Sequence, residues 1–117
     1  MKHAIVFSLL LAAAGSVAIA QVESLPTEHL EVARTTGGVR LTWQLAEPGP
    51  VRLVIYDLAG RPVRSWGEVR QSAGAYSVEW DGLNDSGRSL PAGSYFCRLT
   101  IARAKPVQLT ARISLTR

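Results

Sequence analysis

The sequence predicts an all-β fold, a two-sheet sandwich of about seven antiparallel strands, and three observations support this prediction. Apolar and polar residues alternate with a period of two through most of the chain after residue 20, as in strands that bury one face. Clusters of Gly, Pro, Asp and Asn separate the alternating segments at short intervals. No segment after residue 20 shows a comparable apolar repeat at helical spacing, so helices are not expected.

The expected strands follow one another closely along the chain. They are 30–34, 39–45, 51–56, 63–66, 76–80, 95–101 and 107–115. The first is weak, and the short fourth follows Pro62, which suits an edge strand because proline donates no hydrogen bond to a neighbour. The alternation places Trp80 between the sheets, and Arg40 and Arg112 on solvent faces. In the last segment, five apolar residues are expected to face the core.

The longest turn-forming cluster, 81–87, raises the question of a calcium site. Asp81, Asn84 and Asp85 lie within five residues, and Ca²⁺ binds clusters of side-chain oxygens. The alternating spacing of a calcium loop is missing, and no downstream Glu supplies a bidentate ligand. Asp, Asn, Ser and Gly also form tight turns by bonding to their own backbone, so we expect a structural turn.

The first 20 residues have the features of a signal peptide. A basic start at Lys2 precedes an apolar stretch over 4–11, and small residues lead to Ala18-Ile19-Ala20, which predicts cleavage before Gln21. The uncharged stretch is short and rich in Ala and Gly for a membrane anchor, so no stable transmembrane span is expected after cleavage. The expected organisation is a signal peptide at 1–20, a flexible lead-in at 21–29 and one domain at 30–117, exported to the periplasm, cell surface or medium.

The composition argues against several classes of function. The formal net charge is +4, but the arginines are scattered and no basic run is interleaved with aromatics, so nucleic-acid binding is not expected. Cys97 is the only cysteine and is expected to be a small core residue, and His29 a solvated one. These two residues cannot make a zinc site or a His-dependent triad, and no phosphate-binding loop occurs. We therefore expect no catalytic, metal-binding or cofactor-binding residues, and no enzyme activity.

Several blocks of sequence together resemble one known family. They are a strand–turn–strand at 51–63, a strand ending in Trp-Asp-Gly at 73–82, Asp85-Ser86-Gly87, and a Gly-x-Tyr strand at 91–99. In this order, from about Gly38 onward, they resemble the immunoglobulin-like domain family of the flagellar hook-capping protein. Its members include C-terminal domains of many secreted bacterial proteins. The resemblance implies an Ig-like β-sandwich.

The matching positions are structural in kind, and the family has no catalytic residues to carry over. In the turns and in Gly-x-Tyr, glycine supplies backbone freedom, while the large aromatic residues supply core area. The motif residues are Tyr56, Asp57, Gly60, Trp80, Asp81, Gly82, Gly87, Gly93 and Tyr95.

The resemblance implies two uses for such a domain. One is the C-terminal sorting signal of type IX secretion, in which the secretion machinery at the envelope is the partner. The segment 112–117 is similar to the basic-ended last strand of a sorting domain, although no cargo separates the signal peptide from the domain. The other use is a structural or assembly module with a protein partner. A carbohydrate-binding module is the alternative, and it requires Tyr56, Trp66 and Phe96 to share one outer face.

Overall fold

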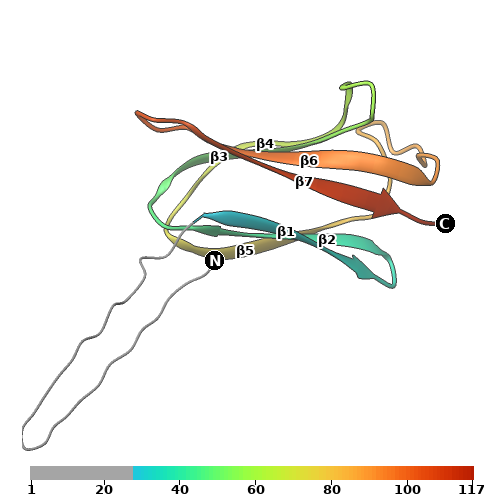
Figure 1. The fold of residues 1–117 in the computed structure, drawn as a ribbon, viewed down its shortest axis with the longest axis horizontal. Coiled ribbons are helices and arrows are strands. Elements are labelled where there is room, and N and C mark those ends of the chain that lie inside the picture. The colour runs from blue at the N-terminus through green and yellow to red at the C-terminus, as the bar shows by residue number, and fades with distance from the viewer. Residues whose placement is uncertain (1–27) are drawn as a thin grey trace, which may run out of the picture.

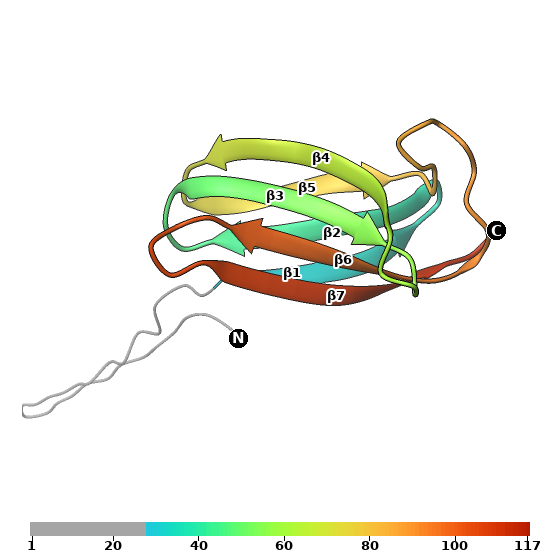
Figure 2. The same ribbon diagram turned by 90° about the horizontal axis from the view of Figure 1, so that it is seen from above.

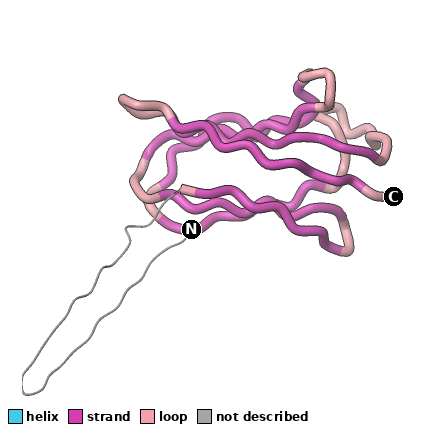
Figure 3. The backbone as a smooth tube through the Cα atoms, in the orientation of Figure 1, coloured by secondary structure: helices cyan, strands magenta, loops and turns pink. Residues whose placement is uncertain are grey.

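The structure is a computed structural model that describes residues 28–117, and it is built entirely from β-strands, turns and loops (Figures 1 and 3). The predicted signal peptide and nearly all of the predicted lead-in lie outside the described residues. In the described part of the chain, no helix is long and apolar enough to cross a membrane.

Seven antiparallel strands form two sheets, which confirms the predicted fold class. The strands are β1 (His29–Thr35), β2 (Gly38–Leu45), β3 (Gly49–Tyr56), β4 (Pro62–Gln71), β5 (Gly74–Trp80), β6 (Gly93–Ile101) and β7 (Val107–Leu115). One sheet has the order β1-β2-β5 and the other the order β4-β3-β6-β7. The two sheets lie face to face in Figure 1, as in a sandwich.

The core lies between the sheets and consists of the apolar residues that alternate along each strand. Trp80 is 1% exposed and packs edge-on against Tyr95, with ring centroids 5.5 Å apart. Arg40 and Arg112 are exposed, so the sequence assigned these faces correctly. Cys97 is fully buried, as predicted. The buried apolar residues are Val39, Leu41, Trp43, Leu45, Val51, Leu53, Val54, Ile55, Trp80, Tyr95, Cys97, Leu99, Ile101, Ile113 and Leu115.

Strand β4 is longer than predicted, because it continues from the expected 63–66 to Gln71. Its second half contains mainly polar residues, and Gly67 has a positive φ of 75° where the register with β3 shifts. A shift of this kind breaks the apolar alternation on which the prediction depended. The strand lies at the edge of its sheet, as Pro62 predicted.

Strand β7 is less buried than predicted. Ile113 and Leu115 are fully buried, but Val107, Leu109 and Ala111 are only half-buried. The reason is that β7 is the outermost strand of the four-stranded sheet, so one side of this row has no neighbouring strand.

The connections divide between the two ends of the sandwich (Figures 1 and 2). One end carries the β1–β2 turn, the β3–β4 turn at 57–61, the long β5–β6 segment at 81–92 and residues 116–117. We call this end the loop end. The opposite end carries the other three turns and Glu28, whose Oε2 accepts hydrogen bonds from Ala46 N at 2.8 Å and Arg103 Nη2 at 3.2 Å.

Candidate partner-binding site

The β3–β4 turn is held by the carboxylate of Asp57. Its Oδ1 accepts hydrogen bonds from the backbone N–H groups of Ala59 and Arg61, each at 2.9 Å, and its Oδ2 accepts one from Arg61 Nε at 2.9 Å. The Arg61 backbone bond, with the other bonds to Ala59 and the guanidinium, lowers the pKa of Asp57. Gly60 provides the positive φ of 85° that the turn requires. The result is a fixed turn whose tip, Leu58, is 67% exposed.

The acidic residues of the 81–92 segment also bond to backbone. Asp81 Oδ1 accepts from Leu83 N at 3.1 Å, and Asn84 Oδ1 accepts from the N–H groups of Ser86 and Arg88 at 2.9 and 3.0 Å. These bonds confirm the structural turn that the sequence predicted. Among residues 28–117, no group of three or more His, Cys, Asp or Glu side chains is placed to hold a metal ion.

The same segment is attached to the sandwich at three points. Trp80 Nε1 donates to the carbonyl of Leu83 at 2.9 Å. The backbone N–H of Asp85 donates to Val63 O at 3.0 Å, and Asp85 Oδ1 accepts from Ser65 N at 3.1 Å. This second attachment satisfies backbone groups on the outer edge of β4, where an unpaired strand would otherwise be open.

The third attachment comes from Arg117, which the sequence did not identify as part of the fold. Its Nη2 donates to Gly82 O at 2.9 Å and to Leu90 O at 2.6 Å, and its Nε donates to Leu90 O at 3.0 Å. Gly82 has a φ of 82°, and a Cβ there would lie 2.7 Å from Arg117 Nη2. The guanidinium therefore closes the base of the 81–92 segment. A basic residue after a strand gives no sequence signal for such a contact.

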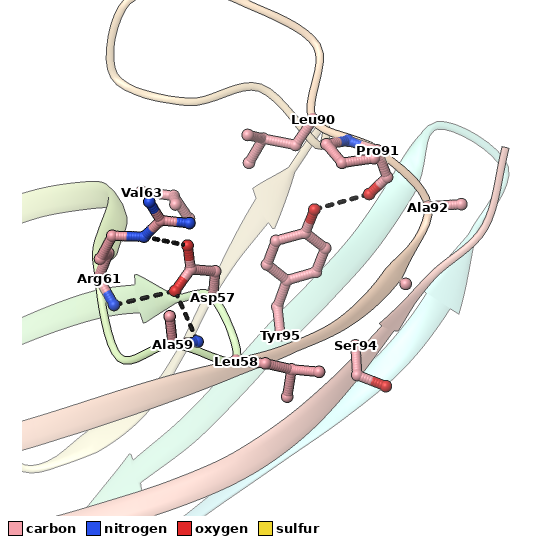
Figure 4. A pocket seen from close by; sticks show the side chains of 11 residues that line it. Asp57, Leu58, Ala59, Arg61, Val63, Leu90, Pro91, Ala92, Ser94 and Tyr95 are labelled. Carbon is pink, nitrogen blue, oxygen red and sulfur yellow. Dashed lines mark hydrogen bonds and ion pairs between the residues drawn. The ribbon is translucent and has the colours of Figure 1, made fainter.

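An open hollow of about 510 Å³ lies between the 57–61 turn and the start of β6 (Figure 4). Tyr95 is 5% exposed beside it, and its hydroxyl donates to Pro91 O at 2.6 Å. Figure 4 shows apolar side chains from both loops around this tyrosine. The lining residues are Asp57, Leu58, Ala59, Arg61, Val63, Leu90, Pro91, Ala92, Gly93, Ser94 and Tyr95. Because three hydrogen bonds within the turn engage the Asp57 carboxylate and most other lining residues are apolar, the hollow suits an apolar side chain.

A second hollow, of about 280 Å³, lies on the outer face of the four-stranded sheet beside the same turn. Tyr56 and Phe96 pair in register on this face, and Arg98 and Thr110 also line the hollow. Leu58 lines both hollows, so the exposed turn tip lies between them.

The structure brings the predicted motif residues together. Asp57, Gly60, Gly93 and Tyr95 line the two hollows. Trp80 packs against Tyr95, which lines the larger hollow. Asp81, Gly82 and Gly87 shape the 81–92 segment. Tyr56 lines the outer hollow. The sequence placed Leu58 only within a turn and Arg117 only within the basic end at 112–117, because an exposed leucine and an arginine after a strand have no spacing that predicts these contacts.

Three aromatic residues do not form the surface that carbohydrate binding requires. Tyr56 and Phe96 lie on the outer face of the four-stranded sheet. Trp66 instead lines an opening between β4 and β5, together with the core residue Trp43 and with Val78. The three rings therefore do not share one outer face.

Cys97 and His29 lie outside both hollows. Burial raises the pKa of the Cys97 thiol to about 11, which disfavours the thiolate. His29 lies 3.7 Å from Glu31 in β1, and its side chain is 43% exposed, in agreement with a solvated residue.

Comparison with known proteins identifies one family. The model of the FlgD Ig-like domain matches residues 30–105, which confirms the family resemblance in the sequence. The crystal structure of FlgD from P. aeruginosa is similar, with 24% identity and a TM-score of 0.55, and the match covers 72% of this chain and 66% of that one. FlgD from Xanthomonas campestris, described in connection with hook capping essential for flagellar assembly, has 26% identity and a TM-score of 0.50. That match covers 78% of this chain and 62% of that one. The chain thus spans less than two thirds of either FlgD structure. No curated protein matches it.

Proposed function

Because this chain belongs to the FlgD Ig-like domain family, we propose that it is an exported, non-catalytic module that binds a protein partner in an assembly at the cell envelope. The solved FlgD relative linked to hook capping supports an assembly role. The signal-peptide pattern of residues 1–20 supports export. The chemistry of the loop end supports a binding role without catalysis, since the Asp57 carboxylate beside the larger hollow is used by its own turn.

The observation that carries this proposal is Leu58. An exposed hydrophobic side chain marks a candidate interaction site when it continues into a larger apolar surface, and Leu58 lines two adjacent hollows. Leu58 is 67% exposed, while the turn beneath it is fixed by the three hydrogen bonds to Asp57. A rigid turn loses little conformational entropy on binding, so a single apolar contact there contributes more to affinity.

Site-specific photocrosslinking tests the proposal. A photoreactive amino acid at position 58 is compared with one at Lys105, an exposed position at the opposite end of the sandwich. In the cells that produce this chain, we expect a discrete protein adduct from position 58 and none from position 105. Equal adduct patterns from both positions, or no adduct from position 58, would contradict binding at the loop end.

Sorting by type IX secretion is a second candidate, and it depends on the basic end of the chain after β7. If the domain is a sorting signal, a reporter fused ahead of it should reach the cell surface in a host with type IX secretion. Arg117→Lys keeps the charge but loses the planar fork that contacts two loop carbonyls. Surface delivery of both the wild-type and the Arg117→Lys fusion would support a sorting signal recognised by its charge. Retention of both fusions in the periplasm would contradict sorting and favour the assembly role.

A further inference from the structure

Two arginines on the outer face of the four-stranded sheet have no acidic partner. Strands β6 and β7 contain no Asp or Glu, and within residues 28–117 neither Arg98 nor Arg112 makes an ion pair. Arg112 pairs with Phe96 and Arg98 with Thr110, so the two arginines are diagonal neighbours on the same face. Diagonal neighbours in a sheet lie about 7–8 Å apart at the backbone, so two positively charged residues share this part of the face.

Four other arginines of the sandwich have a carboxylate within ion-pair distance, whereas within residues 28–117 five others, like Arg98 and Arg112, have none: Arg34, Arg64, Arg70, Arg88 and Arg117. The pairs are Arg40–Glu79, Arg52–Glu68, Arg61–Asp57 and Arg103–Glu28. These four ion pairs lie on both sheets and at both ends of the sandwich. Strands β6 and β7 supply no carboxylate that could offset the charges of the diagonal pair.

Neighbouring groups hold both guanidinium groups in place. The Arg98 guanidinium carbon lies 5.1 Å from the centroid of the Tyr56 ring, and Arg112 Nη2 donates to Ser94 Oγ at 2.7 Å. An arginine stacked on an aromatic ring keeps its N–H donors in one plane for a carboxylate. Tyr56, Phe96, Arg98 and Arg112 form what we call the arginine–aromatic patch.

We propose that this patch binds an acidic segment of the protein partner, with an adjacent apolar side chain of that segment seated in the hollow beside Leu58. This inference rests on the proposed function, since it assigns the chemistry of the partner that meets the loop end. Charge complementarity supports it, because two unpaired guanidinium groups match carboxylates in bidentate geometry. Continuity also supports it, because Leu58, Tyr56, Phe96 and Arg98 line one hollow.

The mixed chemistry of this surface favours a peptide over other anions. The hollow that contains Arg98 adjoins, through Leu58, a larger one lined by Leu90, Pro91 and Ala92. A polysaccharide or a nucleic-acid backbone has charge but no aliphatic side chain to fill these hollows. Binding to a lipid surface depends on a larger cluster of basic residues than this pair.

Titration of the purified chain with designed peptides tests the inference. The probe is a short peptide in which glutamates flank a central leucine, and two comparison peptides replace either the glutamates with lysines or the leucine with serine. We expect the acidic leucine peptide to shift the backbone NMR signals of β6, β7 and the 57–61 turn. The lysine peptide should produce no shifts, and the serine peptide weaker ones.

Arginine variants locate the effect. The double variant Arg98→Ser, Arg112→Ser should weaken binding at least about tenfold, because both guanidinium contacts are lost and one charge-assisted contact already corresponds to about tenfold. Arg70→Ser is the matched control, because Arg70 is exposed on β4 of the same sheet outside the patch, and binding should change less than about twofold. Thermal melts check that all variants remain folded.

Several results would overturn the inference. Equal losses in the double variant and in Arg70→Ser would indicate general charge attraction. Arginine-dependent binding to phosphatidylglycerol vesicles, without binding of the acidic peptide, would indicate a lipid surface. Binding of the lysine peptide, combined with a crosslink at position 58, would refute an acidic partner segment but would still support binding at the loop end. Loss of the crosslink alone would count against the proposed function instead.

Discussion

Replacing Trp80 with alanine tests whether the loop end and the core form one energetic unit. The indole is 1% exposed, packs on Tyr95 at 5.5 Å, and donates to the carbonyl of Leu83 at 2.9 Å. Truncation of a buried tryptophan costs about 3–5 kcal/mol, and loss of the indole bond adds about 1 kcal/mol. A domain of this size has a free energy of unfolding of about 5–13 kcal/mol, so the variant should lose a third or more of it.

Urea unfolding followed by far-UV circular dichroism measures this loss. Trp80→Phe is the first control, since it retains a ring but removes the N–H donor, and it should cost about 1–2 kcal/mol. Arg112→Ala is the second, and it should cost about 0.5 kcal/mol because this side chain is exposed. If Trp80→Ala and Arg112→Ala produced equal, small losses, the assignment of faces and the link between core and loop end would both be refuted.

Three further predictions concern residues 116–117 at the loop end, Glu28 at the opposite end, and cleavage of the signal peptide. Removal of Thr116 and Arg117 should lower the melting temperature by about 4–8 °C, because the bonds from Arg117 to two loop carbonyls, worth about 1 kcal/mol, are lost. An unchanged melting temperature would mean that these bonds do not stabilise the fold. Burial opposes the charged form of Glu28, but the hydrogen bonds from Ala46 N and Arg103 outweigh this effect and lower the pKa of Glu28. The charged carboxylate therefore stabilises the fold above its ordinary pKa of 4.5, and this stabilisation is lost as the pH falls through the lower pKa of the folded state. Glu28→Gln should therefore be less stable at neutral pH and lose less stability on acidification, and parallel acid unfolding curves would disprove this. Finally, intact-mass analysis of exported protein should give a chain that begins at Gln21, and recovery of residues 1–20 on that chain would exclude cleavage.

Strand prediction succeeded where one face of a strand is buried along its whole length. In β2 and β6, every second residue is buried, so the period of two is visible in the residue types themselves. It failed in the second half of β4, where Gly67 shifts the register and the residues beyond it are mainly polar. There the strand is defined by hydrogen bonds to β3, and such bonds do not depend on side-chain polarity.

Only those features of the candidate site that depend on contacts between residues close together in the sequence were predictable. The 57–61 turn depends on bonds within five residues, so Asp57 and Gly60 were recognisable in the sequence. The contact of Arg117 with Gly82 joins residues 35 positions apart, and that of Asp85 with Ser65 joins residues 20 positions apart. Contacts of this kind arise only when the strands have paired, so single-sequence patterns do not contain them.

The positions of Trp80, Tyr95 and Asp57 show how motif residues can support the loop end without binding a partner. Trp80 and Tyr95 are buried, and Asp57 is bound within its own turn, so none of the three is free to bind a partner. Their contacts instead fix the 57–61 turn, which carries Leu58, and the 81–92 segment across the hollow from it. A mobile loop would lose conformational entropy on binding, whereas a fixed one has lost it already during folding. The exposed residues at the tip and on the outer face can therefore be changed without altering the buried residues that hold them in place.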